Sequence, residues 1–343
     1  EAYCQPCLSP VWDTGLAMHA MQESGMVAGD TVLDKAAEWL VDRQITDVVG
    51  DWATRRPGLR PGGWAFQYWN DYYPDVDDTA VVVMALHRAD PVRYKDAINR
   101  GVEWIIGMQS ENGGWGAFDA ENEAYHLNHI PFADHGALLD PPTSDVSARC
   151  LGMLAQLGHG RDEPVVARAI EFLKNEQEED GSWFGRWGTN YVYGTWSVLS
   201  ALNAIGEDMS APYIRRAVDW LKSRQMDDGG WGEDCATYWE ETKGLAKEST
   251  PSQTAWAMMG LMDQPFTGER YFADGGQSHY AGPGGPGRCG IATRPAAARS
   301  PGTSAARRAG ARSRRSEEAL GEAEEKGGDP RAGGGLPRSG GVV

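Results

Sequence analysis

The sequence predicts an all-α fold, an α/α barrel (toroid), because one helical unit recurs along the chain and alternates with second helices. Full copies of the unit occupy residues 101–109, 169–177 and 217–225, and each leads into the pattern Gln-x-x-x-Gly-x-Trp. Self-similar helical segments are typical of repeat architectures, in which each unit buries its apolar face against its neighbours. Helix pairs repeated around an axis predict a barrel.

A degenerate copy at residues 36–44 comes first and precedes a longer loop, in which Gly50 and Trp52 are expected to take the repeat positions. In every copy, apolar residues at helical spacing bury one face, and glycine ends the helix in a conformation that other residues resist. The tryptophan is expected to stack beside the glutamine, whose amide can satisfy the backbone of the next helix end. Second helices are expected between the copies, over residues 144–157, 195–205 and 254–262.

Three carboxylates, from Asp75, Asp77 and Asp78, lie at the start of the apolar stretch 80–86. A helix N-cap needs one Asp, Ser or Thr, so this cluster holds more acid than a cap requires. Crowded like charges raise the pKa of at least one member, and a carboxylic acid that stays protonated near neutral pH can give its proton away. The alternative interpretation is a capped and solvated helix start.

The chain contains 14 Trp, all of them between Trp12 and Trp256, which is far above ordinary usage. Aromatic faces attract cations, with each contact contributing on the order of 0.5 to 2 kcal/mol, most where water is excluded. A protein that carries a carbocation without quenching it needs such a lining. The alternative is that most of these side chains only fill core volume.

The formal net charge is −17, and it is unevenly distributed, because residues 272–343 carry +4 and residues 1–271 carry −21. An acidic body argues against a nucleic-acid partner and against electrostatic attraction to an anionic membrane, so any membrane contact is expected to be apolar. No apolar run has transmembrane length and no signal peptide opens the chain, which predicts a location on the cytosolic side.

Cysteine and histidine spacing does not favour a metal site. Cys4 and Cys7 have the spacing of a metal or redox pair, but a second pair is missing. His126, His129 and His135 lie in a stretch with proline and mixed spacing, which indicates a loop rather than a helix-borne ligand pair. We therefore predict that the protein binds no metal.

Residues 75–80, Asp-Val-Asp-Asp-Thr-Ala, resemble the catalytic motif of the squalene-hopene cyclases, class II terpene cyclases that start cyclisation by protonating a carbon–carbon double bond. The resemblance runs from about residue 3 to about residue 262. Further segments that resemble the same family are 9–14 (Ser-Pro-Val-Trp-Asp-Thr), 62–66 (Gly-Gly-Trp-Ala-Phe), 113–119 (Gly-Gly-Trp-Gly-Ala-Phe-Asp), 185–188 (Gly-Arg-Trp-Gly) and 250–256 (Thr-Pro-Ser-Gln-Thr-Ala-Trp).

The resemblance implies that Asp77 is the general acid, with Asp75 and Asp78 as orienting and charge-tuning partners. It also places Trp12 and Asp13 near this acid. A cluster of carboxylates can hold one proton ready and stabilise the anion left behind, which suits the protonation of an isolated alkene.

Two further polar residues match supporting positions of the family, Asp145 and Arg149. Some family members have His where this chain has Arg149. A permanent cation close to Asp77 would depress the pKa of its carboxyl, whereas an Arg one step away would stabilise the carboxylate formed after proton transfer. The sequence leaves both arrangements open.

The resemblance assigns aromatic residues to the substrate cavity, where they stabilise successive ring cations. It also assigns Phe132, with Ala133, to the constriction through which substrate enters. The cavity residues are Phe66, Phe118, Trp187 and Tyr193.

Two regions are predicted. Residues 1–271 form the C-terminal barrel region of a squalene cyclase, incomplete on its N-terminal side, and the Gly-, Arg- and Ala-rich residues 272–343 form a tail that is disordered or out of frame. The chain also departs from the family pattern after about residue 262, where a further Gln/Trp repeat is missing.

The implied reaction is proton-initiated polycyclisation of squalene to hopene or hopanol, in hopanoid biosynthesis, without a cofactor. The implied partners are squalene or a similar linear isoprenoid, one membrane leaflet touched through an apolar patch on the cytoplasmic side of the cell membrane, and a second copy when full length. Three alternatives remain: a cyclase for another long isoprenoid, a non-catalytic truncated toroid, and a zinc-dependent prenyltransferase-like barrel, which Asp234 and Cys235 suggest.

Overall fold

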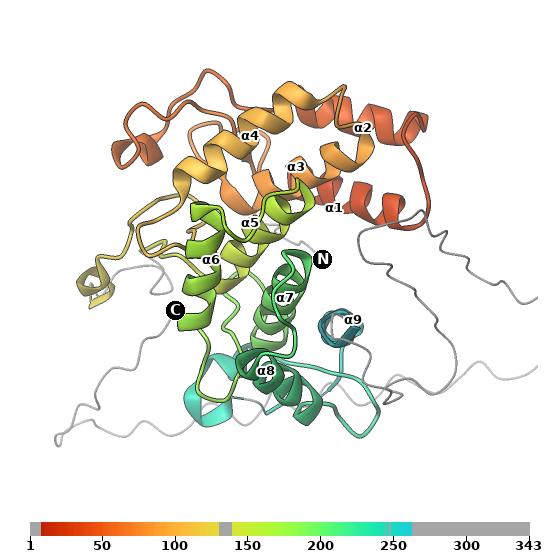
Figure 1. The fold of residues 1–343 in the computed structure, drawn as a ribbon, viewed down its shortest axis with the longest axis vertical. Helices are drawn as coiled ribbons and strands as arrows, with labels where there is room; N and C mark the ends of the chain where they lie inside the picture. Colours follow the sequence, from red (N-terminus) through yellow and green to blue (C-terminus); the bar gives the residue numbers. More distant parts are fainter. Residues whose placement is uncertain (1–7, 130–138, 244, 247, 263–343) are drawn as a thin grey trace, which may run out of the picture. The chain divides into compact units, whose positions relative to one another are not determined.

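The computed structural model describes residues 8–129, 139–243, 245–246 and 248–262 (Figure 1). Within these ranges the secondary structure is almost entirely helical, which confirms the predicted all-α class. The α-helices are α1 (Pro10–Glu23), α2 (Thr31–Val41), α3 (Val76–Ala89), α4 (Lys95–Met108), α5 (Ser144–Gln156), α6 (Pro164–Asn175), α7 (Tyr191–Ala204), α8 (Pro212–Ser223) and α9 (Pro251–Met262). Short 3₁₀ turns add η1 (Asp51–Thr54), η2 (Tyr125–His129), η4 (Cys235–Tyr238) and η5 (Glu240–Thr242).

The helices form two sets that follow the alternation of the sequence. The odd-numbered helices α1, α3, α5, α7 and α9 pack one against the next. Each even-numbered helix packs on odd-numbered ones, with α4 on α3, α6 on α5 and α8 on α7 (Figure 1). Helix pairs stacked in this way are part of an α/α toroid, as the repeats predicted.

The repeat glutamine bonds to the start of the next helix as the sequence predicted, but the glycine does not end the helix: α4 ends at Met108, and Gly113 lies in the turn that follows. The amide of Gln109 donates to the carbonyl of Gly113 at 2.8 Å and to Val165 O, in the first turn of α6, at 2.9 Å. Gln177 makes the same pair of bonds to Gly181 and Tyr213. The repeat glycines have positive φ angles, +98° at Gly113, and this region of backbone space suits glycine.

In each repeat, hydrogen bonds from the tryptophan hold its loop between two helices, an arrangement that we call the tryptophan lock. The indole N–H of Trp115 donates to Ile105 O at 2.7 Å, and its backbone N–H donates to the Ser147 hydroxyl of α5 at 2.9 Å. Trp183 makes equivalent bonds, to Leu173 O at 2.7 Å and to the Thr195 hydroxyl of α7 at 3.0 Å. Each tryptophan is fully buried, so these bonds satisfy polar groups that water cannot reach.

Two of the predicted helix starts were too late. The sequence placed the second helices at residues 195 and 254, whereas α7 begins at Tyr191 and α9 at Pro251. The hydroxyl groups of Thr195 and Thr254 each accept a backbone N–H from the preceding repeat tryptophan instead of marking the helix end.

The degenerate first repeat uses different residues from the predicted Gly50 and Trp52. The amide of Gln44 donates to Gly62 O at 2.8 Å, and the indole N–H of Trp64 donates to Leu40 O at 2.7 Å. Trp64 therefore takes the repeat position, while Trp52 lies in η1. A long insertion separates Gln44 from Gly62. Sequence spacing alone therefore did not show which glycine and tryptophan form the tryptophan lock of this repeat.

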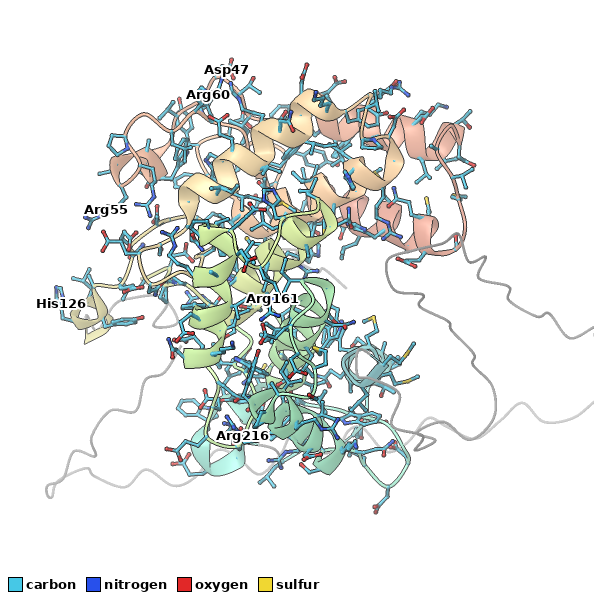
Figure 2. The ribbon with its side chains drawn as sticks, viewed as in Figure 1. Asp47, Arg55, Arg60, His126, Arg161 and Arg216 are labelled. Atoms are coloured by element: carbon cyan, nitrogen blue, oxygen red, sulfur yellow. The ribbon has the colours of Figure 1, made fainter. Side chains whose placement is uncertain are left out.

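The inserted loop between α2 and α3 covers the start of α3 and is anchored to α4. Its exposed side chains Arg55 and Arg60 point outward in Figure 2, and Arg60 Nε donates to the Glu103 carboxylate at 2.9 Å. Arg56, which is half-buried, donates to the carbonyls of Gly107 and Gln109 at 2.7 Å each. These bonds hold the loop against the C-terminal end of α4.

A pair of antiparallel strands, each two residues long, connects this loop to α3. Strands β1 (Trp64–Ala65) and β2 (Pro74–Asp75) pair with Trp64 opposite Asp75. The Thr79 hydroxyl donates to Asp75 O at 2.6 Å and accepts the Trp64 N–H at 2.9 Å. These two hydrogen bonds connect Trp64 of the first repeat to the first turn of α3.

Replacing Gly113 by alanine is expected to destabilise the fold more than replacing Gly158, although both have positive φ angles. A Cβ at Gly113 would lie 2.4 Å from Arg168 O, whereas a Cβ at Gly158 meets nothing within 4 Å. We expect Gly158→Ala to lower the free energy of unfolding by about 1 kcal/mol and Gly113→Ala by a further 1 to 3 kcal/mol, roughly the cost of overpacking. Urea denaturation followed by circular dichroism measures both, and equal losses would contradict the packing explanation.

Candidate active site

Asp75 provides the N-cap of α3, so the local need for a capping residue is met by one of the three aspartates. Its Oδ1 accepts the backbone N–H groups of Asp77 at 2.7 Å and Asp78 at 3.1 Å. The backbone of Asp75 is extended (φ −102°, ψ 131°), as is usual for a cap. Asp77 and Asp78 are also buried, which a solvated helix start does not explain.

Helix α5 brings Arg149 to Asp77, and side chains of α7 and α1 contact Arg149 in turn. Arg149 Nε, from α5, donates to Asp77 Oδ1 at 3.1 Å, and only 8% of Asp77 is exposed. Arg149 also donates to the Tyr193 hydroxyl of α7 at 3.3 Å, and its guanidinium lies 5.5 Å from the ring centroid of Trp12 in α1. The structure thus selects the close approach of Arg149 from the two arrangements that the sequence left open.

Burial raises the pKa of all three carboxyls of the cluster. Burial and then the charge of Asp77 raise the pKa of Asp75 to about 8. The pKa of Asp78 is raised well above its usual range by burial and then by Asp75 and Asp77. Burial also raises the pKa of Asp77, although Arg149 opposes the shift. The cluster therefore retains protons near neutral pH even with a cation in contact.

The Arg149 side chain stays charged in this environment. Burial opposes its charge, but the Asp77 carboxylate and then Tyr193 raise the pKa of its guanidinium above the ordinary value. Asp78 Oδ1 is buried and, within the described ranges, has no hydrogen-bond partner. An unpartnered buried oxygen costs less free energy on a neutral carboxyl than on a carboxylate, which favours a protonated Asp78.

The two other predicted acidic residues act on the cluster through their charge, and the charge of Asp145 contributes to the raised pKa of Asp77. Asp145 Oδ2 accepts the backbone N–H groups of Arg186 at 2.9 Å and Trp187 at 2.8 Å, so this carboxylate shapes a loop. Asp13 is exposed and accepts a hydrogen bond from Ser9 at 3.0 Å, and its charge contributes to the raised pKa of Asp78. The role of each in catalysis stays a prediction.

The predicted cavity aromatics fall into two groups. Tyr193 packs on Trp256 at 5.0 Å between ring centroids, and Trp196 stacks on Trp256 at 5.9 Å. Phe118 meets Trp187 edge to face at 6.0 Å. Sequence reasoning did not assign Trp196 and Trp256 to the site, although Trp196 follows Tyr193 by three positions and therefore shares its helix face.

The two remaining predicted aromatics are Phe66 and Phe132. Phe66 is half-buried and follows Ala65, whose partner across the β1–β2 pair is Pro74, beside Asp75. Phe132 and Ala133 lie outside the described residues, as do Cys4, Cys7 and His135.

No group of three or more His, Cys, Asp or Glu is placed to hold a metal ion within the described ranges. Asp234 instead accepts the backbone N–H of Ala236 at 2.8 Å and so caps η4, and Cys235 is exposed. In the same ranges, none of the helices combines the length and apolar character needed to cross a bilayer.

Comparison with protein families identifies the family to which this chain belongs. Residues 8–275 match the squalene-hopene cyclase C-terminal domain. The chain belongs to the squalene-hopene cyclase family. The match includes α1 to α9, and the predicted region boundary between residues 271 and 272 stays a prediction.

Individual cyclases are highly similar to this chain. It is 65% identical over 269 residues to the squalene-hopene cyclase of Schizosaccharomyces japonicus, and 59% identical over 268 residues to that of Zymomonas mobilis. The corresponding enzyme of Alicyclobacillus acidocaldarius is 59% identical over 261 residues. The alignments cover 75% to 76% of this chain and 41% of each relative, so the chain spans about two fifths of their length.

A solved structure supports the fold. A type II terpene cyclase variant, MstE from Scytonema in complex with merosterolic acid A, superposes with a TM-score of 0.50 at 21% sequence identity. The superposition covers 74% of this chain and 63% of that protein. The squalene-hopene cyclase family and this neighbour therefore share the helical architecture described above.

The stability of the chain is expected to fall as pH rises from about 4 to about 8. Folded Asp75, with a pKa of about 8, keeps its proton in this window, while the unfolded residue at about 3.8 loses it. Each such carboxyl contributes a slope of up to about 1.4 kcal/mol per pH unit. Asp75→Asn, which preserves an N-cap, is expected to flatten the slope measured by urea denaturation at several pH values.

The matched control is Asp208→Asn, at a surface turn, where hydrogen bonds from Ser210 lower the pKa of the carboxyl. Asp208 therefore titrates below this window, and its replacement is expected to leave the slope unchanged. A parent slope that is flat, or one that Asp75→Asn does not alter, would contradict the raised pKa of Asp75.

Proposed function

We propose that this chain carries the proton-donating site of a class II terpene cyclase, and that the whole protein cyclises squalene to hopene or hopanol. The observation that supports the proposal most directly is the buried contact between Asp77 and Arg149 within a cluster of three carboxyls. Relatives at 59% to 65% identity bear the name squalene-hopene cyclase. This activity makes the chain an intramolecular transferase of the isomerase type.

Two opposing effects suit Asp77 to alkene protonation. Burial raises the pKa of its carboxyl and so favours the protonated acid, and Arg149 lowers the free energy of the carboxylate that remains after transfer. The proton of Asp77 goes to one carbon of a terminal double bond, and the alkene π electrons form the new C–H bond. The positive charge develops on the other carbon, while Arg149 Nε, 3.1 Å from Asp77 Oδ1, stabilises the new carboxylate.

The aromatic groups are proposed to stabilise the cation as it moves along the folded chain. Tyr193 contacts the Arg149 guanidinium, and Trp196 and Trp256 pack against Tyr193. Phe118 and Trp187 form a second group. A ring face contributes on the order of 0.5 to 2 kcal/mol to a nearby cation. Loss of a proton or capture of water ends the reaction, so no cofactor is needed.

The test is turnover of squalene by the purified chain in detergent, with cyclised products identified by mass spectrometry. Asp77→Asn is expected to reduce product formation by at least about 100-fold, because a general acid contributes on the order of 10² to 10⁴. Asp208→Asn, on the surface, is expected to retain the parent rate. Absence of product from a folded parent chain, or equal product from Asp77→Asn, would overturn the proposal.

A cyclase for another linear isoprenoid is the second outcome of the same assay. Cyclisation of a different isoprenoid, with none of squalene, would retain the proton-donating role of Asp77 and overturn the proposed substrate. A toroid without activity would form neither product.

We also propose that the protein touches one leaflet of the cell membrane from the cytoplasmic side and pairs with a second copy when full length. Exposed aromatic side chains in the segment before β2 support an apolar contact, since 94% of Trp69 and 64% of Tyr72 are exposed. The net charge of −17 favours zwitterionic over anionic lipid.

Flotation with phosphatidylcholine vesicles tests the membrane contact. The parent chain is expected to float, and the Trp69→Ser/Tyr72→Ser double variant is expected to lose most of the bound fraction because it loses the exposed rings. Substitution of exposed Val92, which lies between α3 and α4, by Ser is the control. A parent chain that stays in solution would contradict the membrane proposal, and a monomer of the full-length protein in sedimentation equilibrium would contradict the pairing.

A further inference from the structure

We propose that Asp140 is a positioning residue for Phe118, and that one short segment, residues 139–145, sets the geometry of the Phe118–Trp187 pair. The inference rests on the proposed function for its consequence, which is where ring faces are presented to the cation. Its structural content stands on hydrogen bonds alone.

Three successive backbone N–H groups converge on the Asp140 carboxylate. Oδ1 accepts Ala117 N at 3.1 Å, and Oδ2 accepts Phe118 N at 2.6 Å and Asp119 N at 2.9 Å. Asp140 is buried, so its carboxylate depends on these donors in place of water. A carboxylate that binds the backbone on both sides of Phe118 leaves this residue little freedom to shift.

Gly116 makes room for this contact. A Cβ at Gly116 would lie 2.6 Å from Asp140 O and 2.8 Å from Asp140 Oδ2. Both distances are shorter than a carbon atom tolerates, so any side chain at this position displaces Asp140 or the loop. The absence of a side chain at Gly116 is therefore part of the same arrangement.

The same segment holds the loop of the partner ring. Asp145 Oδ2 accepts the N–H groups of Arg186 and Trp187, and Leu139 O accepts a hydrogen bond from the Arg186 guanidinium at 2.8 Å. Two prolines at positions 141 and 142 separate the two aspartates, and each proline restricts its own φ angle. The spacing between the Phe118 and Trp187 loops is thus determined by a stiff six-residue segment, 140–145.

The resulting ring pair is directional. Phe118 and Trp187 have an interplanar angle of 79° with centroids 6.0 Å apart, and 48% of Trp187 is exposed. An edge-to-face pair directs ring faces in different directions, and each face attracts positive charge. A shift of the Phe118 loop changes where that attraction acts without removing the acid.

The experiment uses ¹⁹F NMR of the full chain labelled with 4-fluorophenylalanine, because the sequence has only seven Phe. Phe118→Leu assigns the Phe118 signal. Asp140→Asn is expected to shift or split it, because an amide has one acceptor oxygen and presents an NH₂ group to the remaining N–H donors. Asp208→Asn, another carboxylate that accepts backbone N–H, is the matched control and is expected to leave the signal in place.

Two further variants make the result decisive. Gly116→Ala is expected to move the Phe118 signal while Asp140 stays unchanged, and it decides the proposal if Asp140→Asn does not fold. Trp187→Leu is expected to shift the same signal by removing the ring current of its partner. An unmoved Phe118 signal in folded Asp140→Asn or Gly116→Ala would overturn the positioning role, and no shift in Trp187→Leu would overturn the pair.

The readout separates this inference from the proposed function because it needs no substrate. A chain that fails to cyclise squalene but shows the expected Phe118 shifts retains the positioning role. If the chain is active, Asp140→Asn is expected to change the ratio of fully to partially cyclised products, whereas Asp77→Asn is expected to reduce the formation of all of them. An unchanged product ratio would overturn the consequence for cation guidance.

Discussion

The tryptophan lock is the interaction on which the rest of the structure depends. In each repeat, the backbone N–H of a buried tryptophan donates to a hydroxyl in the first turns of an odd-numbered helix, at Thr79, Ser147, Thr195 and Thr254. The candidate site residues Asp77, Arg149 and Tyr193 each lie two positions from one of these hydroxyls. Because the same bond places the start of α3, α5 and α7, three residues distant in sequence meet at one point.

Burial and charge oppose each other at that point. Burial alone would keep the Asp77 proton bound and make it a weak acid, and Arg149 alone would leave a carboxylate with no proton to give. Their contact at 3.1 Å sets burial, which raises the pKa of the Asp77 carboxyl, against the Arg149 cation, which lowers it. Asp75 supports the arrangement by capping α3, so the helix end is satisfied without using Asp77 or Asp78.

The local sequence predicted the full repeat units correctly, but it predicted the wrong tryptophan for the first repeat, which contains a long insertion. The full copies have Gln, Gly and Trp at fixed spacing, and their hydrogen bonds follow it. In the first copy, the position assigned to Trp52 belongs to Trp64, because the loop that separates it from Gln44 is longer than in the other copies. Helix starts at 195 and 254 were placed late because the hydroxyls there bond to a distant backbone rather than to their own helix end.

The sequence by itself determined the helical class, the repeat chemistry and the three-carboxylate cluster, because each depends on residues close together in the chain. Only the tertiary structure decided that Arg149 contacts Asp77, that Asp145 holds the Trp187 loop and that Asp140 holds the Phe118 loop. These contacts join residues 22 to 72 positions apart. Their geometry follows from how successive helices pack, and no local pattern encodes a distance between two packed helices.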